Sequence, residues 1–221
     1  MKPSEAKSVR LDHTALTQLL PPTPSKGALT KAAIVDRALK IASREGLEGL
    51  TVGLLAEALA MSKSGVFAHF GSREELQLAV VREYYHRFEA RVFQPALTES
   101  KGLPRLQKMI NLWMQTSIQE LSAGCIFISG AVEFDDRPGV VRAELVHSVQ
   151  TWRMALRRAI EQAIEVGHLK QDCQADLVLF QIYSYVQGLH HDARFLQLSH
   201  SVEIATQAIQ HTIDENRNRR A

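Results

Sequence analysis

The sequence has little of what marks secreted, membrane-spanning and metal-binding proteins. Its 221 residues include two cysteines, Cys125 and Cys173, which lie far apart and cannot form a metal-ligand cluster by themselves. They imply no disulfide framework, so a reducing cytoplasm is the natural compartment. No apolar run approaches the length that spans a bilayer, and the first residues lack a secretory hydrophobic region. We therefore expect a cytoplasmic protein without a membrane partner.

Catalytic and cofactor-binding signatures are also missing. The chain contains no P-loop, no G-x-S-x-G elbow, no H-E-x-x-H and no G-x-G-x-x-G between a strand and a helix. A carboxylate pair, Asp135 and Asp136, precedes Arg137 and Pro138 and is better explained by helix capping and turn formation. We expect neither enzymatic activity nor a bound cofactor.

Two adjacent histidines, His190 and His191, suggest a metal site. Neighbouring positions on a helix point about 100° apart, so the two rings do not share a face as i, i+4 ligands would. A metal site there needs His147 or an acidic residue brought in by folding. We expect no metal and interpret the pair as a polar interface or a helix-end cluster.

Helical periodicity dominates the chain, and alternating strand patterns are absent. The length allows a small domain and a larger one, and the 45% hydrophobic content is typical of a soluble globular protein. The formal net charge is +2, with a small excess of Lys and Arg in residues 1–97 and of Asp and Glu in residues 98–221. This distribution weakly favours nucleic-acid contact at the N-terminal end.

Residues 51–76 are the most informative stretch and predict two short helices and the start of a third. Apolar side chains recur at helical spacing before residue 60, and Ser62 is a suitable N-cap for a helix that runs to Phe70. A glycine ends that helix, and Ser72 with Glu75 forms a capping box for the next one. A helix of about two turns is marginal alone. Such a helix needs a scaffold, as in a helix-turn-helix that offers its second helix to the DNA major groove.

The outward side of this second helix has a composition suited to DNA. Val66 and Phe70 share the side that would pack. The opposite arc presents four side chains, Lys63, Ser64, Phe67 and Ala68. Lysine can contact phosphate or guanine, serine can bond to base or backbone, and apolar groups can contact the thymine methyl. The alternative is a packed helical hairpin in which Phe67 belongs to the core.

Five runs of residues agree in register with one known pattern: Leu50-Thr51-Val52, Ala56-Glu57, Ser62-Lys63, Phe67-x-His69-Phe70 and Ser72-Arg73-Glu74-Glu75-Leu76. Together they resemble the DNA-binding domain of the TetR family of transcriptional regulators. The resemblance covers residues 29–76 closely, and the rest of the chain only in length and helical pattern. It implies an all-α fold in which a three-helix helix-turn-helix domain joins a larger helical domain for effector binding and dimerisation.

The resemblance also implies roles for individual residues. Thr51 and the N-terminal amides of its helix would hold a backbone phosphate. His69 and Arg73 would contact phosphates at the flanks, although on an ideal helix His69 points away from the DNA-facing arc and a packing role stays open. The predicted DNA-binding residues are Thr51, Ser62, Lys63, Ser64, Phe67, Ala68, His69 and Arg73.

Four positions depart from the family pattern. Ala60 stands where the turn usually has glycine, at a modest strain cost if its φ is positive. Phe67 replaces the usual tyrosine and cannot donate a hydroxyl hydrogen bond to phosphate. Ser64-Gly65 stands where pairs such as Gly-Thr are frequent, so the operator preference does not transfer.

The expected domains follow from the helix boundaries. Residues 1–28 form an N-terminal arm that we expect to be disordered, and its contact with DNA stays open. Residues 29–76 form the DNA-binding domain, whose first helix, about 30–45, is capped by Thr30. A linking helix runs from Ser72 to about Phe93, before Pro95. Residues 95–221 form the larger domain, with helices at about 104–122, 126–134, 139–166, 174–197 and 200–216.

The larger domain offers candidate effector contacts. Side chains that add shape or polarity to its apolar helices are Trp113, Phe127, Phe134, Trp152, Tyr183 and Gln187. As a group they favour an apolar, partly aromatic small-molecule effector, although each alone is more often a core residue. By resemblance, helices 174–197 and 200–216 form the interface of a homodimer, which implies a palindromic operator in double-stranded DNA.

We expect a transcriptional repressor that a small molecule releases from DNA, while activation through the same geometry stays open. The alternative is an all-helical dimeric interaction protein whose helix-turn-helix does not bind DNA.

Overall fold

The computed structural model describes residues 26–218, which fold almost entirely into helices. Within that range the β contacts amount to one isolated bridge, between Leu169 and Arg217. The predicted all-α fold is confirmed. Most of the predicted N-terminal arm, residues 1–25, lies outside the described residues. None of the described helices is long and apolar enough to cross a membrane.

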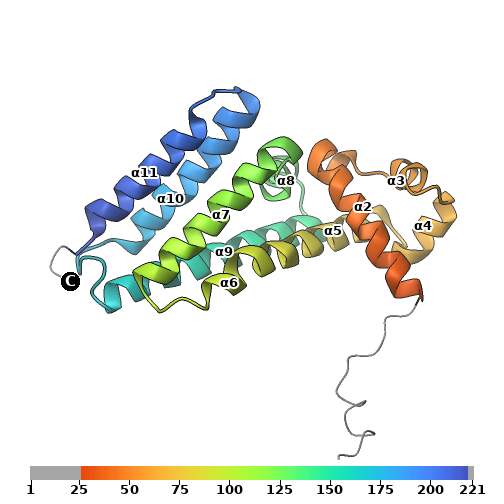
Figure 1. The fold of residues 1–221 in the computed structure, drawn as a ribbon. Coiled ribbons are helices and arrows are strands. Elements are labelled where there is room, and N and C mark those ends of the chain that lie inside the picture. The colour runs from red at the N-terminus through yellow and green to blue at the C-terminus, as the bar shows by residue number, and fades with distance from the viewer. Residues whose placement is uncertain (1–25, 219–221) are drawn as a thin grey trace, which may run out of the picture.

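The N-terminal end of the molecule is a small helical unit built on the start of a long helix (Figure 1). Its elements are α2 (Lys26–Gly49), α3 (Val52–Ala58), α4 (Lys63–Phe70) and α5 (Arg73–Phe88). The apolar stripe of α2 is buried at Ile34, Ala38 and Ala42 and meets Leu55 of α3 and Val66 of α4. Since α3 and α4 are too short to persist alone, this shared core holds them in place.

The start of α2 differs from the prediction. The helix already begins at Lys26, and the Thr30 hydroxyl donates to the Lys26 carbonyl at 2.9 Å. The prediction of Thr30 as the N-cap is therefore wrong, because the residue lies inside the helix, where its hydroxyl bonds back to the preceding turn. The predicted end is confirmed: Gly46 has φ 79° and ψ 167°, which breaks the regular helix before residues 47–49.

The linking helix also extends past its predicted end. After α5 the chain continues through the π-helical turn η1 (Glu89–Phe93) into α6 (Gln94–Ala96), which contains Pro95. Proline has no N–H to donate and usually stops a helix. Here the hydrogen-bond register changes in η1 just before the proline, which then occupies the first turn of α6, where a missing N–H is tolerated.

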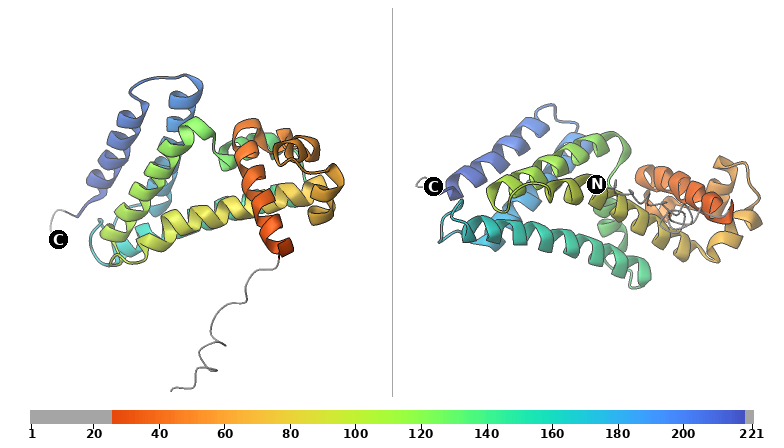
Figure 2. Two further views of the ribbon diagram at one scale, coloured as in Figure 1. Left: turned by 45° about the vertical axis from the view of Figure 1, so that its right-hand side comes forward. Right: turned by 60° about the horizontal axis from the view of Figure 1, so that its bottom comes forward.

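The larger part of the molecule confirms the predicted C-terminal helices. They are α7 (Leu103–Ala123), α8 (Ile126–Phe134), α9 (Val140–Glu165), α10 (Ala175–His190) with the π-helical turn η2 (His191–Phe195), and α11 (Ser201–Asn216). Helices α7, α9 and α10 surround one apolar core that includes Trp113, Trp152 and Ile182. Helices α10 and α11 pack together at the end of the molecule opposite α3 and α4 (Figure 2).

The two parts share helices and core residues. α5 and α9 pack along each other, and α8 packs against both α2 and α9. The N-terminal core therefore continues into the C-terminal part of the chain, where it includes Ile126 and Phe134 of α8 and Val141 and Leu145 of α9. A shift of α8 would be transmitted directly to α2, because their side chains are packed in one core.

Candidate functional site

Side-chain caps define both short helices of the helix-turn-helix. Thr51 is the N-cap of α3 and its hydroxyl accepts a hydrogen bond from the Leu54 N–H at 3.1 Å. Ser62 caps α4 in the same way, with the Gly65 N–H at 3.1 Å. Ala60, in the turn between the helices, has φ 51°, the left-handed conformation that usually requires glycine. The capping predictions for Ser62 and the turn prediction for Ala60 are confirmed.

Helix α4 presents to solvent the arc that the sequence predicted. Val66 is fully buried, and Phe70 is half-buried against the same core. The side chains of Lys63, Ser64, Phe67 and Ala68 are all exposed. Phe67 is 49% exposed, so the interpretation of Phe67 as a core residue is wrong. An exposed aromatic ring beside a lysine contributes little to the fold of this protein and is available to a partner.

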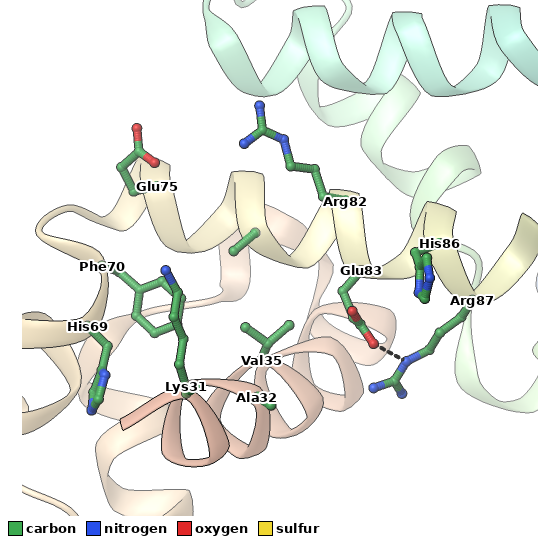
Figure 3. A pocket seen from close by; sticks show the side chains of 12 residues that line it. Lys31, Ala32, Val35, His69, Phe70, Glu75, Arg82, Glu83, His86 and Arg87 are labelled. Atoms are coloured by element: carbon green, nitrogen blue, oxygen red, sulfur yellow. Dashed lines mark hydrogen bonds and ion pairs between the residues drawn. The ribbon is translucent and has the colours of Figure 1, made fainter. Parts of the chain in front are cut away.

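His69 lies at a groove between α2, α4 and α5, with a volume of about 610 Å³ (Figure 3). The Lys31 ammonium nitrogen lies 5.2 Å from the centroid of the Phe70 ring, at the same end of the groove. Further along, Arg87 pairs with Glu83 at 2.7 Å and Asp36 at 3.0 Å. The part of the groove near α4 is thus lined by Lys31 and His69, while Arg87 is held by carboxylates.

Arg73, at the start of α5, makes contacts that the sequence did not reveal. Its Nε donates to the Leu50 carbonyl at 3.0 Å, its Nη2 donates to the Glu48 carbonyl, and the Glu48 carboxylate lies 3.6 Å from Nη2. These bonds join α5 to the residues just before α3. Any phosphate contact by Arg73 would use the remaining nitrogen, Nη1.

Five of the six predicted effector contacts surround one cavity in the larger domain. They are Trp113, Phe127, Trp152, Tyr183 and Gln187. The ring centroid of Trp113 lies 5.4 Å from the ring centroid of Trp152 and 5.4 Å from that of Tyr183. Phe134 lies apart from this cavity, in the core shared by α8 and α2 and at a shallow surface hollow. The cavity volume is about 30 Å³, enough for water but far below the several hundred Å³ of a drug-sized ligand site.

Polar groups that the sequence analysis did not select line the same cavity. Tyr84 donates its hydroxyl hydrogen to Glu120 at 2.6 Å, and its oxygen lies 3.2 Å from the Cys125 sulfur. Because the phenol has a single hydrogen, the thiol is the donor in the second contact. His190 completes the group. The residues come from α5, α7, α10 and the loop before α8. No pattern of neighbouring residues in the sequence therefore predicts that they meet.

Burial sets the protonation of this group. Burial raises the pKa of the Cys125 thiol to about 12, and the nearby Glu120 carboxylate adds to that rise. Burial also raises the pKa of Glu120, while it lowers the pKa of His190 to about 4, with Arg194 adding to the effect. At neutral pH the thiol keeps its proton and the imidazole is neutral.

An open groove of about 1010 Å³, here called the junction groove, connects this cavity to the end of α2 in the N-terminal helical unit. The groove and the cavity share Cys125, Ile128, Gln187 and His190. On the groove's other side, Glu133 of α8 accepts a hydrogen bond from the Glu48 N–H, just before α3, at 2.8 Å. The cavity therefore adjoins an open groove, and α8 is hydrogen-bonded to the end of α2.

Several large hydrophobic side chains of the last helices are exposed. Large hydrophobic side chains there are Leu177, Phe180, Phe195, Leu196, Leu198 and Ile204. Exposed apolar side chains of this size are available to a partner.

A helix-turn-helix with an exposed second helix, joined to a helical domain with a ligand-sized junction groove, defines a DNA-binding regulator of transcription. Residues 34–80 match the family described as "Bacterial regulatory proteins, tetR family", and residues 102–209 match the "Tetracyclin repressor-like, C-terminal domain". The chain belongs to the TetR family of transcriptional regulators. This family comprises regulators rather than enzymes, in agreement with the predicted lack of catalytic activity.

Individual relatives support the same assignment. The HTH-type transcriptional repressor DhaR of Mycobacterium sp. (strain GP1) is 22% identical over 156 residues, 70% of this chain and 77% of that protein. The repressor AcnR of Corynebacterium efficiens is 35% identical over 77 residues, 35% of this chain and 41% of that protein. A TetR-family regulator from Cytophaga hutchinsonii has the same fold, with a TM-score of 0.77 at 15% identity over 89% of this chain and 98% of that one. A putative transcriptional regulator from Saccharomonospora viridis, solved in complex with choline, has a TM-score of 0.74 at 18% identity, covering 86% and 97% of the two chains.

Proposed function

We propose that this chain is a homodimeric repressor that binds a palindromic operator and leaves it when a small molecule occupies the larger domain. The observation that supports it most is the exposed arc of α4, where Lys63, Ser64, Phe67 and Ala68 contribute nothing to either core. Both curated relatives named above are repressors. Since the target is chromosomal DNA, we place the protein in the cytoplasm.

In this proposal the residues of the arc divide between bases and phosphates. Lys63 contacts guanine or phosphate, Ser64 bonds to a base or the backbone, and the rings and methyls of Phe67 and Ala68 meet thymine methyl groups. Thr51 and the first amides of α3 bind a phosphate at a helix N-terminus. Ser62 orders the start of α4, since its hydroxyl already caps the helix.

Phosphate contacts at the flanks come from the groove beside α4 and from the start of α5. His69 lies next to Lys31 in that groove, so one phosphate could contact both side chains. Arg73 contributes its Nη1 and also holds the chain before α3 in place.

Dimerisation uses the exposed apolar face of α10, η2 and α11. A two-fold axis through that face would pair four helices and cover side chains such as Phe180 and Ile204, which are 62% and 63% exposed in the single chain. The two copies of α4 would then face successive major grooves, which requires a palindromic operator.

In this proposal, effector binding must enlarge the small cavity of the larger domain. A ligand larger than water must separate the helices around Trp113, Trp152 and Tyr183, so it binds an opened conformation and shifts the population toward it. The choline complex of the Saccharomonospora viridis protein is an example of a small organic molecule bound to this fold. Movement of α8 would be transmitted through the Glu133–Glu48 hydrogen bond to α3.

Selection of duplexes from a random pool, at two salt concentrations, tests the proposal. We expect enrichment of a palindrome whose affinity falls steeply with salt. The variants Lys63→Ala and Phe67→Ala should lose affinity while Lys101→Ala, an exposed lysine between α6 and α7, should not. A folded, ligand-free dimer that enriches no sequence would instead support an interaction protein without DNA binding.

A further inference from the structure

Three side chains of types that can bind metals converge at the small cavity, where it adjoins the junction groove. One ligand atom each from Glu120, Cys125 and His190 lie within 4.8 Å of one another. Glu120 is near the end of α7, Cys125 is the N-cap residue of α8, and His190 is the last residue of α10. Folding thus brings to His190 an acidic residue, Glu120, and a thiol, Cys125, neither of which is near it in the sequence.

The histidine of this group lacks a hydrogen-bond partner for a buried nitrogen. His190 is 5% exposed, and its Nε2 has no partner among the described residues. A buried polar atom without a hydrogen-bond partner destabilises the fold by on the order of 1–3 kcal/mol. Such an atom in a native protein therefore calls for an explanation, such as a bound ion or water molecule. Other histidines in the described chain, such as His200 and His211, pair with a single carboxylate at the surface.

We propose that Glu120, Cys125 and His190 bind one divalent metal ion of the zinc class, with a water molecule or the Tyr84 oxygen as the fourth ligand. Thiolate, imidazole and carboxylate are the ligands that Zn²⁺ takes in proteins, in tetrahedral geometry. A site with only one carboxylate does not suit Ca²⁺ or Mg²⁺, which require several oxygen ligands. The cavity of about 30 Å³ beside the group leaves room for the ion and a water molecule.

Binding of the metal ion is balanced in both charge and protons. The Cys125 thiol gives its proton to solvent through the adjoining groove, and the resulting thiolate with the Glu120 carboxylate neutralises the two positive charges of the ion. The imidazole of His190 contributes a lone pair and no charge. Ligand atoms around a tetrahedral zinc ion lie roughly 3.5 Å apart, given metal–ligand distances of about 2.0–2.3 Å, so the group must contract slightly on binding.

That contraction acts on the start of α8, and this part of the inference rests on the proposed function. Cys125 precedes the first residue of α8, and Glu133 near its end accepts the hydrogen bond from the Glu48 N–H. Metal binding would therefore pull the helix that contacts the residues before α3. The ion would act on operator affinity alone or together with an organic effector in the same cavity.

Cobalt(II) titration of the reduced full-length protein tests the site without DNA. A thiolate ligand gives cobalt a charge-transfer absorption, and Zn²⁺ should abolish this absorption by displacing the cobalt. We expect one equivalent of Co²⁺ to bind, with the band lost in Cys125→Ser. Affinity should fall about 100-fold or more in His190→Gln and Glu120→Gln, since even second-shell changes cost 10–100-fold. The matched controls Cys173→Ser and His191→Gln should bind as the unmodified protein does.

Thermal unfolding of each metal-free variant separates a lost ligand from a lost fold. Glu120→Gln is the mildest change, because the amide oxygen still accepts the Tyr84 hydrogen bond. A folded wild-type protein without a thiolate band would overturn the site, and so would a band that disappears in Cys173→Ser.

Operator binding with and without Zn²⁺ then tests the coupling to α8. We expect Zn²⁺ to change the operator affinity of the wild type about 10-fold and to leave Cys125→Ser unchanged. Unchanged affinity in a protein that has bound the metal would overturn the coupling. A failure to bind any DNA would contradict the proposed function, while the cobalt result would stand by itself.

Discussion

The exposed arc of α4 and the cavity of the larger domain differ in the surroundings of their polar groups. On α4 the cap Ser62 has a partner in the Gly65 N–H, and Lys63 and Ser64 face solvent. In the cavity the indole N–H of Trp152 and Nε2 of His190 are buried without a partner among the described residues. A surface for a charged polymer can stay hydrated until binding, whereas an internal site excludes water and stores polar groups for its ligand.

The two regions should therefore respond differently to the same truncation. Trp113→Ala removes a buried ring from the cavity wall and should lower the free energy of unfolding by about 3–5 kcal/mol. Phe67→Ala removes a ring that is 49% exposed and should change it by less than about 0.5 kcal/mol. Urea denaturation measures both. Equal losses in the two variants would mean that Phe67 is packed in solution, against a partner copy or the core.

A pH series examines the buried polar group. The pKa of His190 falls to about 4 in the folded protein from 6.5 in the unfolded chain. The unfolded chain therefore binds the proton first, and stability is lost as pH drops from about 6.5 to 4, by up to about 3 kcal/mol for this group.

The contributions of neighbouring groups to the pH dependence of stability must be separated from that of His190. Glu120 opposes the trend, because its raised pKa favours the folded state in acid, while the Cys125 thiol, whose pKa is raised to about 12, stays protonated. The difference in stability between the wild type and His190→Gln, measured in chelator at each pH, isolates the histidine. A difference that does not depend on pH would show that His190 is hydrated in solution.

A substitution on the DNA-facing arc should affect binding and leave folding intact. Lys63→Ala should weaken operator binding by about 1–3 kcal/mol if the lysine contacts guanine. If it contacts only phosphate, the loss should be uniform across sequences and the salt slope should fall by about one. Titration of the selected duplex at several salt concentrations distinguishes the two, and an unchanged affinity would place Lys63 outside the interface.

The smallest expected effect concerns the turn between α3 and α4. Ala60 has φ 51°, and Ala60→Gly should relieve this strain at the cost of greater freedom in the unfolded chain. We expect a net stabilisation of about 0.5 kcal/mol, since left-handed backbone costs a non-glycine residue about 1–2 kcal/mol. A small rise in Tm at constant operator affinity is the measurement. A drop in Tm would indicate that the Ala60 methyl group is packed in the dimer.

Predictions from sequence succeeded where the deciding interactions are local. The caps Ser62 and Ser72 accept hydrogen bonds from the N–H three residues later, at 3.1 and 3.0 Å. The buried side of α4 follows from helical spacing, as the burial of Val66 and exposure of Phe67 confirm. The predicted helix boundaries at Thr30 and Pro95 were wrong for two different reasons. Threonine can also lie inside a helix, where its hydroxyl bonds to the preceding turn, as Thr30 does. Proline can also occupy the first turn of a helix, as Pro95 does in α6.

The helices, the helix-turn-helix and its outward-facing arc follow from local sequence patterns, because contacts within a turn of helix depend on neighbours a few residues apart. Helix packing, in contrast, brings Tyr84, Glu120, Cys125 and His190 together beside one cavity and places Phe134 of α8 in the N-terminal core. These residues lie on separate helices and have no shared period. Their meeting depends on how whole helices pack, which is fixed by the combined fit of many side chains rather than by any local pattern.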